Sequence, residues 1–314
     1  MNPAENLFRQ IRSEIDSVII GNDQAKAVIV SAVLAGGNIL LEGVPGVAKT
    51  LIARSLARVL GLGFSRIQFT PDLMPSDITG TSVFNQAKGE FEFVPGPIFS
   101  DFVLADEINR APAKTQAALL EAMEEKQVTI DNRTYKLRPA FMVFATQNPL
   151  DFEGTYSLPE AQLDRFMVRI QMSYPTADEE LSILSDLSCK PAQLLESVTP
   201  VENAMGVIET AQEFIHEIVI DEKVMLYIRD IIRASRELDD LVLGNSPRSG
   251  QMLVRMAKAY AAVTGCGFVT PDHVRELAPA VLPHRWVLRP EAEMKQDPLS
   301  PIIAALFDSV KVPA

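Results

Sequence analysis

The segment Asn38-Ile39-Leu40-Leu41-Glu42-Gly43-Val44-Pro45-Gly46-Val47-Ala48-Lys49-Thr50 decides the fold. It begins with an apolar run typical of a buried strand, and it ends where the apolar residues take on the spacing of an amphipathic helix. The part between, from Gly43 to Thr50, follows the phosphate-loop pattern G-x-x-x-x-G-K-S/T, with Ala48 in place of the second glycine. Successive backbone N–H groups in such a loop, together with the N-terminus of the next helix, can surround a chain of phosphates.

The same loop carries the side chains that bound phosphates need. Lys49 supplies a compact positive charge for the terminal phosphates, and the Thr50 hydroxyl can ligate Mg²⁺. Ala48 leaves two alternatives, because a left-handed backbone at alanine costs about 1–2 kcal/mol: either this residue is right-handed, or the loop is strained. The competing interpretation of the whole segment is a glycine-containing strand-to-helix turn with a chance Lys-Thr pair.

A second apolar run, Phe102 to Ala105, ends in the adjacent acids Asp106 and Glu107. A carboxylate at the end of a buried strand is costly unless a positive charge lies nearby, and a metal-bound nucleotide would supply one. Neighbouring residues of a strand point in opposite directions, so the two acids can take separate roles. We expect Asp106 to hold the Mg²⁺ shell and Glu107 to polarise the attacking water.

Three further segments place polar residues at the ends of expected elements. The apolar run Phe141 to Ala145 ends in Thr-Gln-Asn, and an amide there can orient a water beside a γ-phosphate without adding repulsion. Arg165 lies at a helix end just before a strand, where a cation is mildly favourable. Arg248 begins a helix, where a cation is unfavourable unless an anion compensates for it.

The pattern along the chain predicts two domains. Residues 1–175 alternate apolar strand-like runs, including 64–69 and 166–172, with helical segments such as 112–126. Continuous apolar runs suit a parallel sheet that is covered on both faces, and their alternation with helices predicts a doubly wound α/β domain. Residues 176–314 show helical periodicity and almost no strand signal, so we expect a smaller all-helical domain there.

Composition narrows the classes of function. The 314 residues suit about two domains, and 47% hydrophobic content is enough for a buried core. The net charge of −12 disfavours a general nucleic-acid binder. Cys189 and Cys266 form no CxxC pair, which excludes a zinc ribbon and a disulfide scaffold, and the three histidines show no HExxH spacing. Because we find neither a signal peptide nor a run that could span a membrane, we expect a cytoplasmic protein.

Taken in order, the segments GVPGVAKT, FVLADEINRA, FATQNP, LPEAQLDRF and SPRS resemble the AAA+ ATPases, and specifically the MoxR family. The resemblance spans nearly the whole chain and implies an AAA+ core with a helical lid, ATP and Mg²⁺ as cofactors, and ATP hydrolysis. The nucleotide would be held by the Walker A loop, formed by Gly43, Val44, Pro45, Gly46, Val47, Ala48, Lys49 and Thr50. Ile20 and Gly21 would line the adenine pocket, although an ordinary core segment before a turn is the alternative.

The resemblance also implies roles for the other polar residues. Thr50 and Asp106 would hold the metal, and Glu107 would be the catalytic base of the Walker B pair. Asn148 would be sensor 1. Arg165 would be an arginine finger that acts on the neighbouring subunit's nucleotide, and Arg248 would be the nucleotide-binding sensor 2.

The family resemblance implies a homo-oligomeric ring, a hexamer, that acts as an ATP-driven chaperone. Its clients would be partner proteins that need maturation, activation or cofactor insertion, often proteins with a von Willebrand factor A domain. Two alternatives stay open: a magnesium-chelatase-like motor subunit, and a non-motor scaffold switched by nucleotide. The intact pair Asp106 and Glu107 argues against the scaffold, and the net charge of −12 argues against a helicase.

Two insertions, Thr81 to Phe99 and Thr129 to Arg138, have hairpin-like patterns with turn residues near their tips. They resemble the helix-2 insert and the pre-sensor-1 hairpin of the AAA+ branch that includes the chelatase motors. In the first insertion Phe91 and Phe93 alternate with glutamates, so a strand would place both rings on one face. Either both rings pack onto the protein's own core, or they form an exposed aromatic contact for a client.

Overall fold

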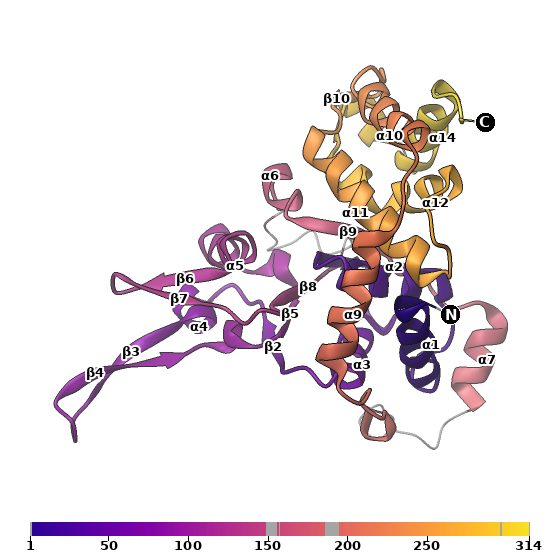
Figure 1. Cartoon of the computed structure of the whole chain (residues 1–314). Helices are drawn as coiled ribbons and strands as arrows, with labels where there is room; N and C mark the ends of the chain where they lie inside the picture. The colour runs from indigo at the N-terminus through magenta and orange to yellow at the C-terminus, as the bar shows by residue number, and fades with distance from the viewer. Residues whose placement is uncertain (1, 149–155, 157, 186–194, 296, 314) are drawn as a thin grey trace.

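The computed structural model describes residues 2–148, 156, 158–185, 195–295 and 297–313. At its centre lies a parallel sheet with the strand order β2-β5-β8-β1-β9 (Figure 1). Its strands are β1 (Asn38–Glu42), β2 (Phe64–Gln68), β5 (Phe102–Asp106), β8 (Met142–Gln147) and β9 (Phe166–Gln171). Each strand closely matches one of the apolar runs expected from the sequence.

The strands of this sheet contribute to two separate cores, because successive side chains point to opposite faces. Ile39 and Leu41 are buried in the core that includes α1 (Pro3–Asp16), α2 (Asp23–Leu34) and α3 (Lys49–Val59). Leu40 faces the other core, which includes α4 (Pro75–Thr79) and α5 (Ala113–Glu125). The sheet is therefore covered on both faces, which confirms the predicted doubly wound α/β fold.

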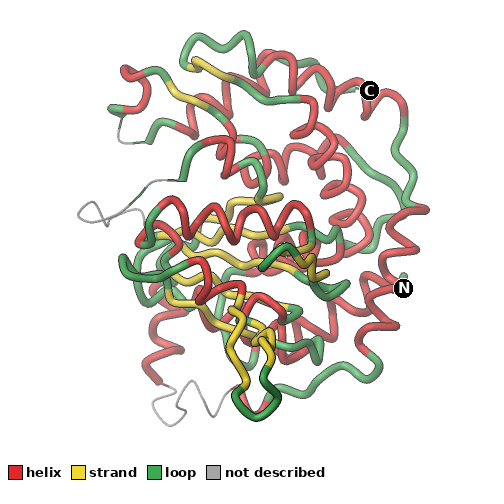
Figure 2. Tube along the Cα trace, turned by 90° about the vertical axis from the view of Figure 1, so that its left-hand side faces the viewer, coloured by secondary structure: helices red, strands yellow, loops and turns green. Residues whose placement is uncertain are grey.

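Two antiparallel hairpins project together from one side of the sheet, as Figure 1 shows, and they come toward the viewer in Figure 2. The longer one pairs β3 (Gly80–Asn85) with β4 (Glu90–Pro95), and the shorter one pairs β6 (Gln127–Ile130) with β7 (Arg133–Lys136). Their turns contain left-handed residues, Gly89 in the first and Asp131-Asn132 in the second. Both predicted insertions are therefore hairpins, with the turn residues where the sequence placed them.

The remainder of the chain is mainly helical and lies against the right-hand side of the sheet in Figure 1. Its helices are α7 (Ala177–Ser185), α9 (Ala204–Glu217), α10 (Glu222–Ala234), α11 (Pro247–Val263), α12 (Pro271–Val281), α13 (Pro290–Glu293) and α14 (Leu299–Ser309). The sequence did not indicate the small antiparallel pair β10 (Leu241–Leu243) and β11 (Val287–Leu288). Strands of two or three residues are too short to show a periodicity.

The helical part and the N-terminal helices share one buried core. Ala4 and Leu7 of α1 belong to the same apolar cluster as Leu253 of α11. The lid is also held to β9, because His284 Nε2 lies 3.1 Å from the Phe166 carbonyl oxygen. Packing thus crosses residue 175, and the division into 1–175 and 176–314 stays a prediction.

The structure also bears on the membrane and cysteine predictions. Within the described ranges, every helix is too short or too polar to cross a membrane. Cys266 is a half-buried thiol that is not in a disulfide, whereas Cys189 lies outside the described residues.

Candidate functional site

The phosphate-loop segment forms a tight connection between β1 and α3. Gly43 and Gly46 have φ angles of 154° and 91°, which suit glycine. Ala48 also lies in the left-handed region, at φ 60° and ψ 18°, so the second alternative holds and the loop carries strain. Ala48 is the N-cap of α3 and makes no side-chain cap hydrogen bond. The N–H groups of the first helical turn can therefore serve a bound anion.

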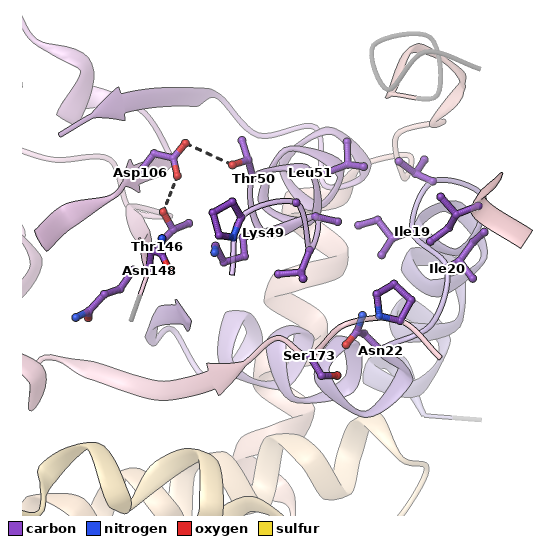
Figure 3. Close-up of a pocket in the computed structure, with 18 of the residues that line it drawn as sticks. Ile19, Ile20, Asn22, Lys49, Thr50, Leu51, Asp106, Thr146, Asn148 and Ser173 are labelled. Atoms are coloured by element: carbon purple, nitrogen blue, oxygen red, sulfur yellow. Dashed lines mark hydrogen bonds between the residues drawn. The ribbon is translucent and has the colours of Figure 1, made fainter. Parts of the chain in front are cut away.

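Lys49 is folded back over this loop. Its ammonium group donates to the carbonyl oxygen of Val44 at 3.0 Å and also to that of Gly43. Figure 3 shows the lysine between the polar and apolar ends of the cavity. An anion at the mouth of the loop would give this ammonium a stronger, charged acceptor than the two carbonyls.

A cavity of about 590 Å³ opens above the loop and contains most of the predicted nucleotide-binding residues. Those that line it are Ile20, Pro45, Gly46, Val47, Ala48, Lys49, Thr50, Asp106, Glu107 and Asn148. Gly21, Gly43, Val44, Arg165 and Arg248 are not among the described residues that line it. The structure thus brings the loop, the acid pair and the sensor amide together, and it leaves the two predicted arginines elsewhere.

The polar end of the cavity is organised around Asp106, which is buried. Thr50 Oγ1 lies 3.4 Å from Asp106 Oδ2, and Thr146 Oγ1 donates to Asp106 Oδ1 at 2.5 Å (Figure 3). The same Thr146 oxygen accepts the backbone N–H of Glu107 at 2.8 Å. Thr146 has no predicted role, and its one sequence signal is its position directly after the apolar run 141–145.

Glu107 has a left-handed backbone, at φ 56° and ψ 51°, and its carboxylate is held at the surface of the cavity. Glu107 Oε2 accepts from Gln68 Nε2 and from Arg110 Nη1, both at 2.9 Å. Both contacts are made to Oε2, so they orient the carboxylate, and neither occupies Oε1, whose lone pairs can accept a proton from a water. Gln68, which ends the neighbouring strand β2, was not predicted from the sequence.

A second arginine, Arg66 of β2, contacts the acid pair formed by Asp106 and Glu107. The Arg66 guanidinium contacts Asp106 Oδ2, with its Nη2 atom at 2.6 Å. The sequence did not indicate this contact, because Arg66 and Asp106 are 40 positions apart and meet only because β2 and β5 are neighbours. The contact places a positive charge beside the oxygen that faces Thr50.

The residues at this end fit a magnesium ion carried by a nucleotide. Mg²⁺ prefers oxygen ligands and usually takes one or two protein groups together with substrate phosphates. The Thr50 hydroxyl and the Asp106 carboxylate are oxygen donors 3.4 Å apart. No cluster of three His, Cys, Asp or Glu side chains suited to a metal is found in the described part of the chain. The donor set therefore suits a metal that arrives with phosphates better than one held by protein alone.

The other end of the cavity is apolar. Figure 3 shows Ile19, Ile20 and Leu51 at that end, away from Asp106. Such a surface suits the flat face of a nucleotide base. Gly21 lies directly after Ile20 with φ 73°, and Glu179 Oε1 occupies the space that a Cβ on Gly21 would need. Gly21 thus permits the close approach of α7.

Arg165 and Arg248 lie together, outside the described lining of this cavity. Arg165 Nε is 3.0 Å from one oxygen of Glu124, and Arg248 Nη1 is 3.4 Å from the other. Arg248 Nε also lies 3.5 Å from Asp164 Oδ2. The anion that a cation at the start of α11 needs is therefore provided by two carboxylates. We call Arg165 and Arg248 the arginine pair.

Comparison with known proteins agrees with this geometry. The sequence profile of the ATPase family associated with various cellular activities (AAA) matches residues 38–168, and the AAA lid domain profile matches residues 233–302. These two profiles define an ATPase-type core with its lid. The chain is 40% identical over 311 residues to Chaperone MoxR1 of Mycobacterium tuberculosis, covering 96% of this chain and 81% of that protein.

Two further relatives span almost the whole chain. The uncharacterized protein YeaC of Bacillus subtilis is 45% identical over 300 residues, which cover 95% of this chain and 92% of the relative. A solved structure of a proposed ATPase from Cytophaga hutchinsonii is 40% identical, with a TM-score of 0.88 over 99% of this chain and 96% of that one. The chain belongs to the MoxR family of AAA+ ATPases.

Proposed function

We propose that this chain hydrolyses ATP in the presence of Mg²⁺ and uses the hydrolysis as a chaperone for partner proteins. The observation that carries the proposal is the two-ended cavity, with Asp106 at its polar end, Ile20 at its apolar end and Lys49 between them. A triphosphate and a base need such opposite surroundings. MoxR1, a relative over nearly the full chain, is named a chaperone.

The residues divide the chemistry among them. The loop N–H groups and Lys49 bind the phosphates, and Thr50 with Asp106 would hold Mg²⁺, which neutralises charge on the phosphates when bound. Asn148 orients a water beside the terminal phosphate. Glu107 accepts the proton from that water, while Gln68 and Arg110 orient its carboxylate through Oε2.

Assembly is the second part of the proposal. The arginine pair lies outside the described lining of its own cavity, so it is suited to reach the nucleotide of a neighbouring copy. A repeated contact of this kind between unlike faces forms a ring when its rotation closes, and we propose a hexamer. An arginine supplied between subunits raises turnover by about 10³–10⁵ in related phosphoryl transfers.

The client side of the proposal rests on the projecting hairpins. Phe84 and Phe91 at the β3-β4 hairpin are 50% and 70% exposed, and their ring centroids are 5.2 Å apart. An exposed aromatic pair can contact the apolar surface of a client. We propose a client or adaptor with a von Willebrand factor A domain. We also propose a cytoplasmic location, where ATP and Mg²⁺ are supplied.

One experiment tests the ATPase and the client parts together. Phosphate release is measured for the purified wild-type chain with ATP and Mg²⁺, and Glu107→Gln protein loaded with ATP is used to capture partners from lysate. The captured protein is then purified, and its activity is followed with wild-type chain, with and without ATP. Turnover at or below that of the Lys49→Ala variant would overturn the ATPase assignment. Client activation that needs no ATP would overturn the chaperone assignment.

A further inference from the structure

Helix α7 presents an apolar and acidic face that the described part of its own chain leaves uncovered. Its inner side is in use, because Ile183 lines the nucleotide cavity and Glu179 lies against Gly21. On the opposite side, Glu180, Leu181 and Leu184 follow the helical spacing of three and four residues and so share one face. Leu181 and Leu184 are 65% and 63% exposed, and none of the residues described in α7 is buried. We call this the outer face of α7.

A groove of about 690 Å³ between α10 and α11 has the complementary character. Its floor is apolar: Ile228 and Ile232 are buried, and Gly250 packs against Ile232. A Cβ built on Gly250 would lie 3.4 Å from Ile232 Cγ1, so the missing side chain keeps the floor low at this point. We call this the lid groove.

The charges of the two surfaces are opposite. Four arginines line the lid groove and its described lining contains no acid; they are Arg229, Arg233, Arg236 and Arg255. In a chain with a net charge of −12, such a cluster is unusual. Arg229 is paired with Asp230, which lies outside the lining, at 2.7 Å, whereas the guanidinium of Arg233 makes no ion pair or hydrogen bond with another described residue. The first turn of α7 instead carries the exposed acids Asp178 and Glu180, beside the inward-facing Glu179, and its last turn has no basic residue.

We propose that the outer face of α7 in one chain docks into the lid groove of a second copy of the chain. The two surfaces lie at separate ends of the molecule, α7 at the lower right of Figure 1 and α10 near the top, so one chain cannot join them within itself. The nine residues of α7 span about 14 Å, a length suited to a groove between two helices. In this contact Leu181 and Leu184 pack on the apolar floor of the lid groove, and the acids of α7 pair with the arginines at the rim of the groove.

This docking adds a specific contact to the proposed ring, and it depends on that proposal. Pro247, which lines the lid groove, directly precedes Arg248 of the arginine pair. Ile183 of α7 likewise lines the nucleotide cavity. When the arginine pair of one copy approaches the cavity of its neighbour, the lid groove is therefore carried toward the neighbour's α7. The docking thus links the position of one lid to the nucleotide of the next subunit.

Reversing the charges separately on the two surfaces tests the docking. One chain carries Asp178→Lys and Glu180→Lys on α7, and a second carries Arg229→Glu and Arg233→Glu in the lid groove. All four residues are exposed, so folding should be retained, which melting curves check. With ATP and Mg²⁺, sedimentation should show that each variant alone needs about tenfold more protein than wild type to assemble, because like charges then face each other.

An equimolar mixture of the two variants distinguishes this contact from a general charge effect. In alternating order, every interface of the mixture pairs either two wild-type surfaces or two reversed ones, so the mixture should assemble near the wild-type concentration. A chain with all four substitutions should do the same. The control Glu209→Lys with Glu213→Lys, which reverses two exposed acids on α9, should leave assembly unchanged.

The outcomes separate this docking from the ring itself. Wild-type assembly with both reversed variants assembling equally well would overturn the docking and leave the ring proposal standing. The docking between chains would also be overturned if the equimolar mixture fails to assemble while the fourfold variant assembles. The two surfaces would then contact each other within one chain. A wild-type chain that stays monomeric with ATP would overturn the ring, and the docking with it. The double variant Leu181→Ser with Leu184→Ser tests the apolar contact with the floor of the lid groove, and unchanged assembly of this variant would contradict that contact.

Discussion

Arg66 donates two hydrogen bonds to a single oxygen of Asp106, from Nε at 2.9 Å and from Nη2 at 2.6 Å. That oxygen, Oδ2, is the one that faces the Thr50 hydroxyl. The two strands that carry the pair are neighbours, with Arg66 beside Leu104 in the register of β2 and β5. A guanidinium therefore lies where we expect the positive charge of Mg²⁺, and it would compete with a bound Mg²⁺ for the same carboxylate.

Replacing Arg66 by glutamine should strengthen the use of Mg²⁺. The Arg66 side chain is half exposed, and an ion pair of that kind contributes about 0.5–1 kcal/mol. The Mg²⁺ concentration for half-maximal nucleotide binding should then fall by about two- to fivefold, which a fluorescent nucleotide titrated with Mg²⁺ would measure. Arg138→Gln, which removes the distant pair with Asp101, is the matched control. An unchanged or higher Mg²⁺ requirement in Arg66→Gln would contradict the competition.

The loop lysine and the acid pair should separate binding from hydrolysis. Lys49→Ala should abolish tight ATP binding, because the phosphates lose the charged side chain of the loop. Glu107→Gln should keep ATP binding and lose turnover, since an amide cannot accept the proton. Calorimetric titration with ATP and a phosphate-release assay measure the two properties. An equal loss of ATP affinity in both variants would refute this division of roles.

The arginine pair should act between subunits. Arg165→Ala and Lys49→Ala proteins should each be inactive alone, but a mixed ring can pair an intact loop with an intact arginine. In a random equimolar mixture one-half times one-half of the interfaces do so, which predicts about a quarter of the wild-type turnover. Arg248→Ala should complement Lys49→Ala in the same way, because Glu124 holds both arginines. No recovery at any ratio, with mixed assembly verified, would contradict action in trans.

The two phenylalanines of the long hairpin should behave differently. Phe91 is 70% exposed, whereas Phe93 stacks on Tyr135 at a centroid distance of 4.3 Å and joins the two hairpins. Phe91→Ser should leave melting and basal turnover unchanged and should weaken client-stimulated turnover. Phe93→Ser should lower the free energy of unfolding by about 1–3 kcal/mol. The reverse pattern in thermal melts would show that the rings had been assigned to the wrong surfaces.

Stability should fall in mild acid because of a histidine at the junction of lid and sheet. Burial, with Arg285 nearby, lowers the pKa of His284 well below its ordinary value. Below about pH 6.5 the unfolded chain binds a proton at this residue that the folded chain does not, so the free energy of unfolding falls with falling pH. The slope attributable to this residue approaches about 1.4 kcal/mol per pH unit until the folded pKa is reached.

Urea unfolding between about pH 7 and about pH 5.5 measures that slope. His284→Gln retains an N–H donor for the Phe166 carbonyl and removes the titration, so its unfolding curve should be flatter. His216→Gln, at an exposed histidine, should keep the wild-type slope. A wild-type slope in His284→Gln would show that other groups cause the acid sensitivity.

Sequence reasoning identified the ends of elements better than the partners that meet there. Apolar runs gave the strands, and the loop and acid residues lie at strand ends as expected, since parallel strands share one carboxyl edge. Arg66, Gln68 and Thr146 were missed because their contacts depend on which strands are neighbours and on their register. Phe91 and Phe93 were expected to be either both packed on the core or both exposed. Their separation depends on Tyr135, which belongs to the other hairpin.

The grouping of Arg165 with Arg248 depends on still longer range contacts. Glu124 lies between them because the C-terminal part of α5 approaches Arg165, which follows α6 (Glu160–Leu163), and also the start of α11. The local pattern around Glu124 is that of an ordinary exposed helix. No periodicity or motif in the sequence indicates that this glutamate bridges residues 41 and 124 positions away.

The location of the arginine pair has a consequence for a newly synthesised chain. Such a chain folds with a complete phosphate loop, yet its two arginines rest on Glu124, outside the described lining of the cavity. We therefore expect it to hold nucleotide without consuming it. ATP turnover per chain should therefore rise with protein concentration. The cellular concentration of the protein would then determine when hydrolysis starts, and unassembled monomers would not consume ATP.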